Sequence, residues 1–272
     1  MSSESLSPWL ALREGADSAA RSAALTRAVI DRLAAFSPVR VLDLGAGTGS
    51  NLRYLAPRLA VPQQWLLVDH DATLLQEAKA RSIGRPAPID WRVDTRPLDL
   101  VTVDHPEIFV DRHLVTASAL LDLVSGQWLD ELAERCRTVR ATVLFTLNYN
   151  GQSRCTPAEP EDEEVRALMN RHQESDKGLG GVAAGPAAID SAERAFAAKG
   201  YFVRREASDW VLSPEQDELQ RQLIRGWAHA AWEIAPNRRR SIDDWLARRL
   251  AHVQARRSHV VVGHEDLAAW LP

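Results

Sequence analysis

Three glycines alternate with small residues directly after an apolar run in the segment VLDLGAGTGSN, residues 41–51. Glycine lets the backbone approach a ligand closely, and a turn from a strand into a helix points several N–H groups at one place. Gly45, Gly47 and Gly49 therefore predict a binding site for a nucleotide-like cofactor. The competing interpretation is a tight strand-to-helix turn that holds no ligand.

A carboxylate, Asp69, ends the next apolar run, WLLVD over residues 65–69. It stands 20 residues after Gly49 (69 − 49), which is the spacing of a β-α-β unit. A carboxylate can accept hydrogen bonds from two adjacent hydroxyls, while Asp71 is the better cap for the helix that follows. A dinucleotide fingerprint would need glycine at Ser50, so a nicotinamide dehydrogenase fits poorly.

Together, these residues resemble the first motifs of the class I S-adenosylmethionine-dependent methyltransferases, of the type that acts on small molecules. That family has an acidic residue two positions before the sequence G-x-G-x-G, and Asp43 stands there in this chain. The resemblance implies S-adenosylmethionine as the cofactor, with Asp69 on the ribose hydroxyls and His70 against the adenine. The cofactor-binding residues that we expect are Asp43, Gly45, Ala46, Gly47, Gly49, Asp69, His70, Asp99, Leu100, Ser118, Ala119 and Arg21.

The family also has an acidic residue after its third strand, which bonds the adenine amino group. Two residues compete for this role here, Asp94 and Asp99. The distance to the fourth strand resembles that of the family more closely for Asp99, which is followed by Leu100. We therefore expect Asp99 at the adenine.

The segment LVTASALLDLV, residues 114–124, resembles the family pattern hhxASxxLxxh. The resemblance implies that Ser118, Ala119 and Leu120 border the methionine part of the cofactor and that Asp122 turns toward the substrate. The alternative for Asp122 is a cap at the start of a helix. Its carboxylate can act as a general base only within hydrogen-bond reach of the acceptor.

Candidate general bases are Asp122, His172 and Tyr149, in that order. His172 stands with Arg171 and Lys177 beside the Gly-rich segment DKGLGGVAAGP, in a stretch that often faces the acceptor in the resembling family. Tyr149 lies in the segment NYNG, for which ordinary turn chemistry is the competing interpretation. A lone histidine on a helix is more often structural or exposed.

Near the N-terminus, Arg13, Asp17 and Arg21 stand four residues apart, which places them on one helical face. One interpretation is a lid in which Arg21 or Arg13 pairs with the methionine carboxylate or with an acidic substrate. The other is a solvated ladder of i,i+4 ion pairs.

These residues must be positioned by an alternation of strands and helices, which is typical of a doubly wound parallel sheet. We expect an α/β fold, a Rossmann-like, seven-stranded methyltransferase sheet with helices on both faces. The strands are expected over 39–45, 65–69, 89–93, 113–118, 141–148, 201–205 and 258–263, and the helices over 51–56, 72–81, 127–139, 160–173, 187–200, 214–234 and 241–257. A further helix is expected from about residue 17 to just before Pro38.

We predict an N-terminal helical lid over 1–38 and a methyltransferase domain over 39–272. A helical insertion at about 213–257 falls between the last two strands and is expected to act as a cap over the acceptor. Ser241 is a credible N-cap for its second helix. Four tryptophans could wall an apolar pocket or simply form a core between helices: Trp210, Trp227, Trp232 and Trp245.

The insertion is also rich in arginine, with NRRR and two further RR pairs against Asp243 and Asp244. Such a stripe could hold phosphates of RNA, or it could be a solvated face. The net charge of −4 argues against a protein that coats nucleic acid.

The composition, 45% hydrophobic and 26% charged residues, is that of a chain with a sizeable core. Only Cys136 and Cys155 are present, so there is no thiolate cluster for zinc. The first residues do not read as a signal peptide and no apolar run reaches membrane-spanning length, so we expect a cytoplasmic protein without a membrane partner. The predicted function is methyl transfer from S-adenosylmethionine to a small molecule; the alternatives are an RNA methyltransferase and a cofactor-binding module without catalysis.

Overall fold

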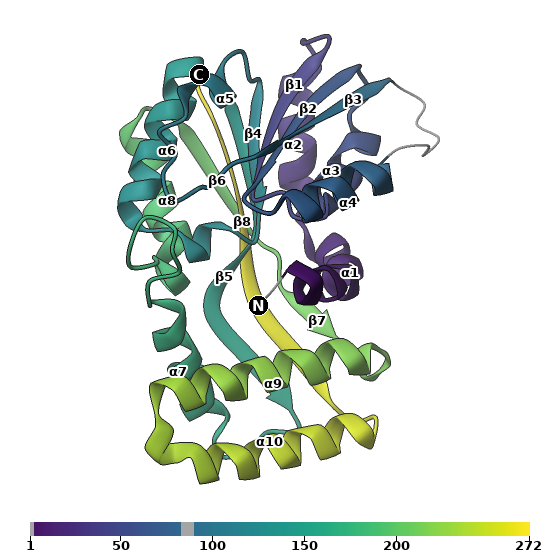
Figure 1. The fold of residues 1–272 in the computed structure, drawn as a ribbon, viewed down its shortest axis with the longest axis vertical. Coiled ribbons are helices and arrows are strands. Elements are labelled where there is room, and N and C mark those ends of the chain that lie inside the picture. The colour runs from purple at the N-terminus through teal and green to yellow at the C-terminus, as the bar shows by residue number, and fades with distance from the viewer. Residues whose placement is uncertain (1–2, 83–89) are drawn as a thin grey trace.

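A computed structural model describes residues 3–82 and 90–272. Within these ranges eight strands form one sheet, in the order β3-β2-β1-β4-β5-β8-β6, with β7 paired to β8 (Figure 1). The strands are β1 Val39–Leu44, β2 Gln63–Asp69, β3 Trp91–Pro97, β4 Leu114–Ser118, β5 Thr142–Thr156, β6 Phe202–Ala207, β7 Trp210–Leu212 and β8 His259–Trp270. The helices are α1 Ser3–Ala20, α2 Ala23–Leu33, α3 Ser50–Leu55, α4 Ala72–Ser82, α5 Pro106–Phe109, α6 Gly126–Val139, α7 Asp162–Gln173, α8 Ala188–Ala198, α9 Asp217–Ile234 and α10 Arg239–Gln254.

The first five strands are parallel, and β8 runs antiparallel between β5 and β6. In register, Leu44 at the end of β1 lies beside Val68 of β2 and Ala117 of β4. The glycine turn after β1 therefore lies at the same edge of the sheet as the ends of β2 and β4, which is where ligands bind in open α/β sheets. The predicted α/β sheet is confirmed; β7 is an additional short strand, and Ile89 of the expected third strand lies outside the described residues.

Helices cover both faces of the sheet, as predicted. Helices α5, α6 and α8 bury one face, and α2, α3 and α4 bury the other (Figure 1). Helix α6 shows why: Ser125 accepts a hydrogen bond from the Trp128 N–H at 3.2 Å and caps the helix, and its apolar stripe is fully buried. That stripe consists of Leu129, Leu132, Ala133 and Cys136.

Strand β5 is longer than the sequence suggested, because NYNG is part of the strand and not a turn. The strand bends where its pairing with β8 shifts register, between Phe145 and Asn148, and Leu147 has a positive φ of 58° at this bulge. The Leu147 N–H donates to Asp266 of β8 at 2.8 Å. The second half of β5 thus continues past the parallel strands, still paired with β8, toward α7, α9 and α10 (Figure 1).

Two N-terminal helices replace the one expected from residue 17 to Pro38. Helix α1 ends at Ala20, and Ser22 caps α2 by accepting a hydrogen bond from the Leu25 N–H at 3.1 Å. The backbone N–H of Ser22 donates in turn to Asp266 at 2.8 Å. A serine that can cap a new helix therefore interrupts the helical pattern and lets α1 leave the sheet.

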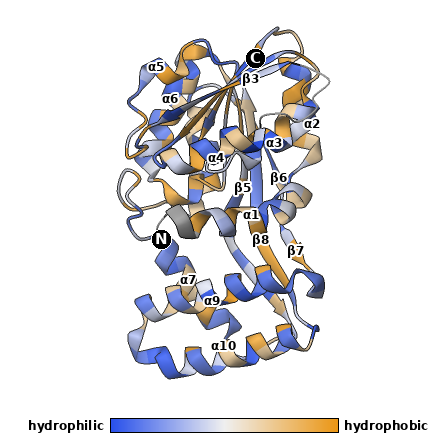
Figure 2. Ribbon diagram, turned by 45° about the vertical axis from the view of Figure 1, so that its right-hand side comes forward, coloured by the Kyte–Doolittle hydropathy of each residue, from blue (hydrophilic) through white to orange (hydrophobic). Residues whose placement is uncertain are grey.

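The insertion forms two antiparallel helices, α9 and α10, between β7 and β8. Helix α10 starts at Arg239, so Ser241 lies inside it and is not its N-cap. One face of α10 points inward, with Ile242, Trp245 and Val253 buried, whereas Figure 2 shows mostly hydrophilic residues along the rest of α10. Trp210 and Trp227 are also buried, in a core that these helices share with β5, β8 and α7. The tryptophans of the insertion thus serve mainly as core.

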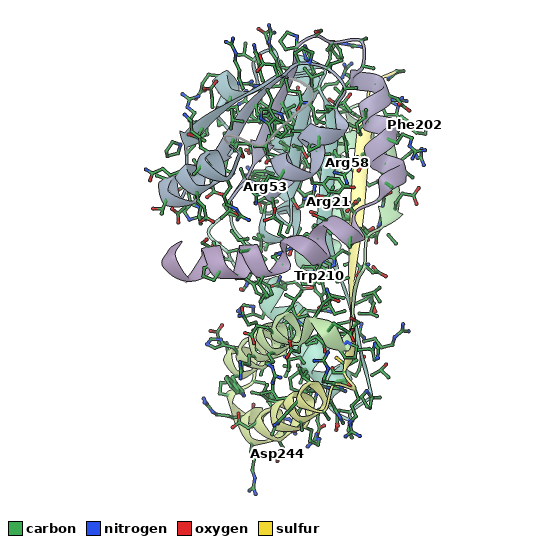
Figure 3. All side chains as sticks on the ribbon, turned by 90° about the vertical axis from the view of Figure 1, so that its right-hand side faces the viewer. Arg21, Arg53, Arg58, Phe202, Trp210 and Asp244 are labelled. Carbon is green, nitrogen blue, oxygen red and sulfur yellow. The ribbon has the colours of Figure 1, made fainter. Side chains whose placement is uncertain are left out.

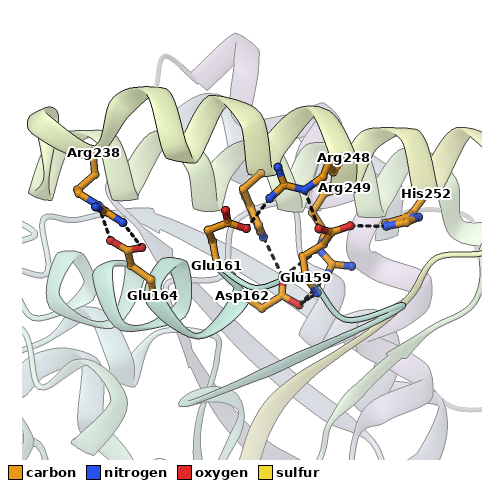
Figure 4. Close-up of polar contacts among 9 residues, drawn as sticks. Glu159, Glu161, Asp162, Glu164, Arg238, Arg248, Arg249 and His252 are labelled. Atoms are coloured by element: carbon orange, nitrogen blue, oxygen red, sulfur yellow. Dashed lines mark hydrogen bonds and ion pairs between the residues drawn. The ribbon is translucent and has the colours of Figure 1, made fainter.

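Three arginines of the insertion are paired with carboxylates at the start of α7 (Figure 4). Arg238 forms two hydrogen bonds of 2.7 Å with Glu164, and Arg248 contacts Glu159 at 2.6 Å. Arg249 is fully buried and pairs with Asp162. These three arginines of the stripe therefore already have carboxylate partners within the chain, which disfavours phosphate binding by them.

We predict that Arg249→Ala lowers the free energy of unfolding by about 3 kcal/mol, because it leaves the carboxylate of Asp162 without its buried partner. Urea denaturation followed by circular dichroism measures this change. Arg257→Ala, an exposed change on the same segment, is the control and should shift stability by less than about 0.5 kcal/mol. An Arg249→Ala variant as stable as the control would contradict a structural role for the ion pair.

In the part of the chain that the structure describes, no helix is long and apolar enough to cross a membrane.

Candidate cofactor and acceptor site

A cavity of about 610 Å³ lies at the carboxyl ends of β1, β2 and β4, under helix α1. Its walls come from the glycine turn, the ends of the parallel strands, α1 and the loop after α7. The lining includes most of the expected residues, namely Asp43, Gly45, Ala46, Gly47, Asp69, His70, Asp99, Leu100, Ser118 and Ala119. Sequence positions far apart therefore meet at one cavity, as the resemblance implied.

The glycine turn needs its glycines for different reasons. Gly45, Gly47 and Gly49 all have positive φ, which other residues adopt with strain. A Cβ on Gly47 would stand 3.2 Å from the Leu10 side chain of α1, whereas a Cβ on Gly49 would stand 3.0 Å from Ala78 of α4. Gly45 and Gly47 therefore keep the cavity open, and Gly49, which does not line it, lets α3 and α4 pack closely.

Asp69 ends β2 and fixes the glycine turn to it. One carboxylate oxygen accepts a hydrogen bond from the Gly47 N–H at 2.8 Å, and the other accepts from the Asp71 N–H at 3.0 Å. Each carboxylate oxygen has a second acceptor position, so the group can still take two adjacent hydroxyls. Asp71 caps α4 as predicted, because its side chain accepts from the Thr73 N–H at 2.8 Å.

Asp43 is buried at the end of β1, and its two oxygens have different surroundings. Oδ1 accepts a hydrogen bond from the Asn51 amide at 2.7 Å, whereas Oδ2 has no partner among the described residues. Burial raises the pKa of Asp43 to about 7, although the hydrogen bond from Asn51 and the charge of Arg21 oppose this rise. A buried carboxylate with an open acceptor site suits the cationic end of S-adenosylmethionine, so the residues present fit this cofactor.

Arg21 is buried behind the cavity and does not belong to a solvated ladder. Its guanidinium donates to Asn51 Oδ1 at 2.5 Å and to Ser118 Oγ at 2.9 Å, and its Nε has no described partner. The structure thus connects Arg21 to Asp43 through Asn51, a residue that sequence reasoning missed. The position of Asn51 directly after the glycine turn was the available signal.

The two candidates for the adenine contact are separated by the structure. Asp99 lies in the segment after β3 and lines the cavity with Leu100, whereas Asp94 is exposed in the middle of β3. His70 also lines the cavity, and its Nδ1 lies 3.2 Å from an oxygen of Asp69. Asp99 is therefore the residue placed for an adenine contact, which remains a prediction.

Helix α1 closes the cavity on the side opposite the sheet. Glu14 of α1 accepts two hydrogen bonds of 2.7 Å from Arg53 of α3, which is buried (Figure 3). Trp9 and Arg13 of α1 line the cavity, so α1 contributes an apolar and a charged side chain to its wall. The tie between α1 and α3 holds this wall over the glycine turn.

The proposed ladder is half correct. Arg13 forms a two-pronged pair with Asp17, at 2.9 and 3.1 Å, but the pair is buried against Trp210, whose ring N–H donates to Asp17 at 3.1 Å. Figure 3 shows Trp210 beside α1. The guanidinium carbon of Arg13 lies 4.9 Å from the Trp210 ring centroid. Sequence spacing identified the pair, but only the fold brings β7 against α1.

None of the three candidate bases is among the described cavity-lining residues, although Asp122 is next to the lining residue Leu123 and His172 contacts the lining residue Lys177. Asp122 is buried, accepts a long hydrogen bond of 3.5 Å from Gln173, and has one oxygen without a described partner; burial raises its pKa to about 6. His172 is set back behind Lys177. The Tyr149 hydroxyl donates to Asn170 at 2.8 Å, and burial raises the Tyr149 pKa well above its usual range.

The helices of the insertion contribute none of the described lining residues. We expected the insertion to cover the acceptor; instead, α1 and residues 177–179 form the cover. The physical reason is the length of β5 and β8, which carries α9 and α10 beyond the cavity edge (Figure 1). Helix α9 reaches the site only indirectly, through the contact of Glu233 with His172 at 2.9 Å.

The sequence matches no protein-family model and no curated protein. Solved structures similar to the chain include the cyclopropane synthase MmaA2 from Mycobacterium tuberculosis, with 12% identity over 91% of this chain and 83% of that one, and a TM-score of 0.49. Another is a putative sarcosine dimethylglycine methyltransferase from Galdieria sulphuraria, with 12% identity, 90% and 83% covered, and a TM-score of 0.46. A third is a methyltransferase from Geobacter sulfurreducens in complex with S-adenosyl-L-homocysteine, with 15% identity, 93% and 92% covered, and a TM-score of 0.46.

Proposed function

We propose that the chain is an S-adenosylmethionine-dependent methyltransferase that acts on a small molecule. The observation that carries this proposal is the arrangement of Asp69 and Asp43 at one cavity. Asp69 is held by the Gly47 N–H and keeps free acceptor positions, and one oxygen of Asp43 has no partner among the residues that the structure describes. The first suits two ribose hydroxyls and the second suits a cationic amino acid group.

S-adenosylmethionine supplies a methyl group on a sulfonium, which is already a strong electrophile. The protein needs chiefly to hold the acceptor in line with that methyl group and to exclude water. Helix α1 serves the second purpose, because Trp9 and Leu10 close the cavity over the glycine turn. Ser118 and Ala119, at the end of β4, border the same cavity from the sheet side.

A general base is needed only where the acceptor must lose a proton in the reaction. Asp122 is the strongest of the candidates, because it is flanked by the cavity-lining residues Leu120 and Leu123 and has a raised pKa. The side chains of His172 and Tyr149 already form polar contacts with Glu233 and Asn170, respectively.

Calorimetric titration of the protein with S-adenosylmethionine, S-adenosylhomocysteine and NAD tests the proposal. We expect both adenosyl ligands to bind and NAD not to bind. Binding of NAD alone, or of none of the three, would reject the proposed cofactor. Binding of the adenosyl ligands without turnover on any acceptor would support the module without catalysis.

A further inference from the structure

The Gly-rich loop after α7 presents one lysine, Lys177, to the cavity. The loop is closed by a bridge between Asp176 and Val182, and the Leu179 carbonyl accepts a hydrogen bond from the Ser125 N–H at 3.2 Å. A Cβ on Gly180 would stand only 3.1 Å from the Ser125 hydroxyl, so the loop packs closely against the start of α6. Lys177 is thus placed by a packed loop.

All the hydrogen-bond partners of Lys177 in the described chain are uncharged when His172 is neutral. Its Nζ donates to the His172 carbonyl at 2.7 Å and to the Ser175 hydroxyl at 2.9 Å, and it lies 3.2 Å from His172 Nδ1. The other ring nitrogen of His172 contacts Glu233 at 2.9 Å, and in the neutral tautomer that donates to Glu233 the Nδ1 atom accepts from Lys177. Asp122 and Glu233 favour the charge of Lys177 only from beyond hydrogen-bond contact.

The other charges of the cavity are already assigned or paired. Arg13 is neutralised by Asp17, and three carboxylates lie on the proposed cofactor side, at Asp43, Asp69 and Asp99. Among the described lining residues, Lys177 is therefore the cation that lacks an ion-pair partner. A partly buried charge without a counter-ion is unfavourable, and an anionic ligand removes this cost.

We propose that Lys177 pairs with a carboxylate or phosphate group of the methyl acceptor, which makes the substrate an organic acid or a phosphate ester. This inference rests on the proposed function, because it assigns Lys177 to the acceptor part of the same cavity. The cavity that Lys177 lines also has apolar walls, which include Leu123, Leu179 and Trp9, so the rest of the acceptor has an apolar body.

The test uses four probes of similar shape and different charge on the full chain saturated with S-adenosylhomocysteine. These are benzoate, phenyl phosphate, benzamide and benzylamine, and calorimetry measures the affinity of the protein for each. We expect at least one of the two anions to bind, and the amide and the amine to bind at least about 10-fold more weakly, since a hydrogen bond to a charged group is the stronger kind. The anion that binds more tightly identifies the acidic group of the acceptor.

Lys177→Met should weaken anion binding about 10- to 100-fold, while Lys177→Arg keeps most of it. Lys199→Met is the matched control, because Lys199, directly after α8, pairs with Glu134 in the second half of α6 and is not among the described cavity-lining residues. S-adenosylhomocysteine affinity should stay within about 2-fold in all three variants, since Lys177 is assigned to the acceptor side.

The inference is overturned when neither anion binds, when benzamide or benzylamine binds as tightly as the anions, or when Lys177→Met binds them unchanged. If the Lys177→Met variant does not fold, the comparison of probes on the wild-type protein still decides. If S-adenosylhomocysteine itself does not bind, the proposed function fails, and the same four probes are titrated without it. The two failures are therefore distinguishable.

Discussion

Replacing Asp69 by alanine is expected to lower the affinity for S-adenosylmethionine by at least about 100-fold. The carboxylate is assigned to two ribose hydroxyls, and each hydrogen bond to a charged group contributes about 1.5–3 kcal/mol. The same carboxylate holds the Gly47 N–H at 2.8 Å, so its loss also releases the glycine turn. Calorimetry with S-adenosylmethionine measures the change.

Asp71→Ala provides the matched control for this prediction. It removes a carboxylate two residues away that caps α4 through the Thr73 N–H. We expect a loss of stability of about 1 kcal/mol with little change in affinity for the cofactor. Unchanged affinity in Asp69→Ala would show that the ribose assignment is wrong, and an equal loss in both variants would indicate a general disturbance of the loop.

The sheet and the meeting of Asp43, the glycine turn and Asp69 at one cavity could be predicted because their signals are local. Asp43, the glycines and Asp69 each stand at a strand end, and parallel strands bring their carboxyl ends to one edge. The cap of α4 by Asp71 is a contact over two residues. Such contacts follow from sequence spacing, so the pattern alone was sufficient.

The parts that could not be predicted depend on pairings over long distances in the sequence. Strand β5 continues through NYNG because β8, more than 100 residues later, pairs with it and Asp266 satisfies the bulge at Leu147. Arg21 is four residues from Asp17, as a ladder requires, but the end of α1 at Ala20 turns it toward Asn51. Local spacing cannot contain this information.

The position of the insertion depends on the same long strands. Sequence order placed it correctly between the last two strands, and the expectation of a cap assumed strands of ordinary length. The 15 residues of β5 and the 12 residues of β8 carry α9 and α10 away from the cavity. The role of the arginines in the insertion could not be predicted from their charge either. Their partners Glu164, Glu159 and Asp162 come from another part of the chain.

Asp122→Asn is expected to make the protein more stable at pH 8, by up to about 3 kcal/mol. Burial raises the pKa of Asp122 from an ordinary value of 3.8 to about 6. The folded state therefore binds this proton more tightly than the unfolded state does, so the wild-type protein loses stability as the pH rises from about 4 to about 6. Asparagine does not ionise and avoids this loss.

Urea denaturation of both proteins at pH 4, 5, 6 and 8 measures the effect. The difference in stability should be small at pH 4, grow up to about pH 6 and then stay constant, because other groups such as Asp43 titrate in both proteins and cancel. A difference that does not change with pH would contradict a raised pKa at Asp122. Most of the expected gain in stability comes from the burial of the Asp122 carboxylate, and Asp122 is buried in the fold.

The same variant should lose methyl transfer while it gains stability. As a general base, Asp122 would contribute about 100- to 10,000-fold in kcat for an acceptor that must lose a proton, and asparagine cannot accept one. The rate of S-adenosylhomocysteine release measures kcat, with an acceptor chosen from the organic acids or phosphate esters that bind. Wild-type activity should rise as the pH increases through about 6. A stable variant with unchanged kcat would show that Asp122 is not the general base. A variant that gains stability and loses activity would show that the buried carboxylate destabilises the fold but is needed for the reaction.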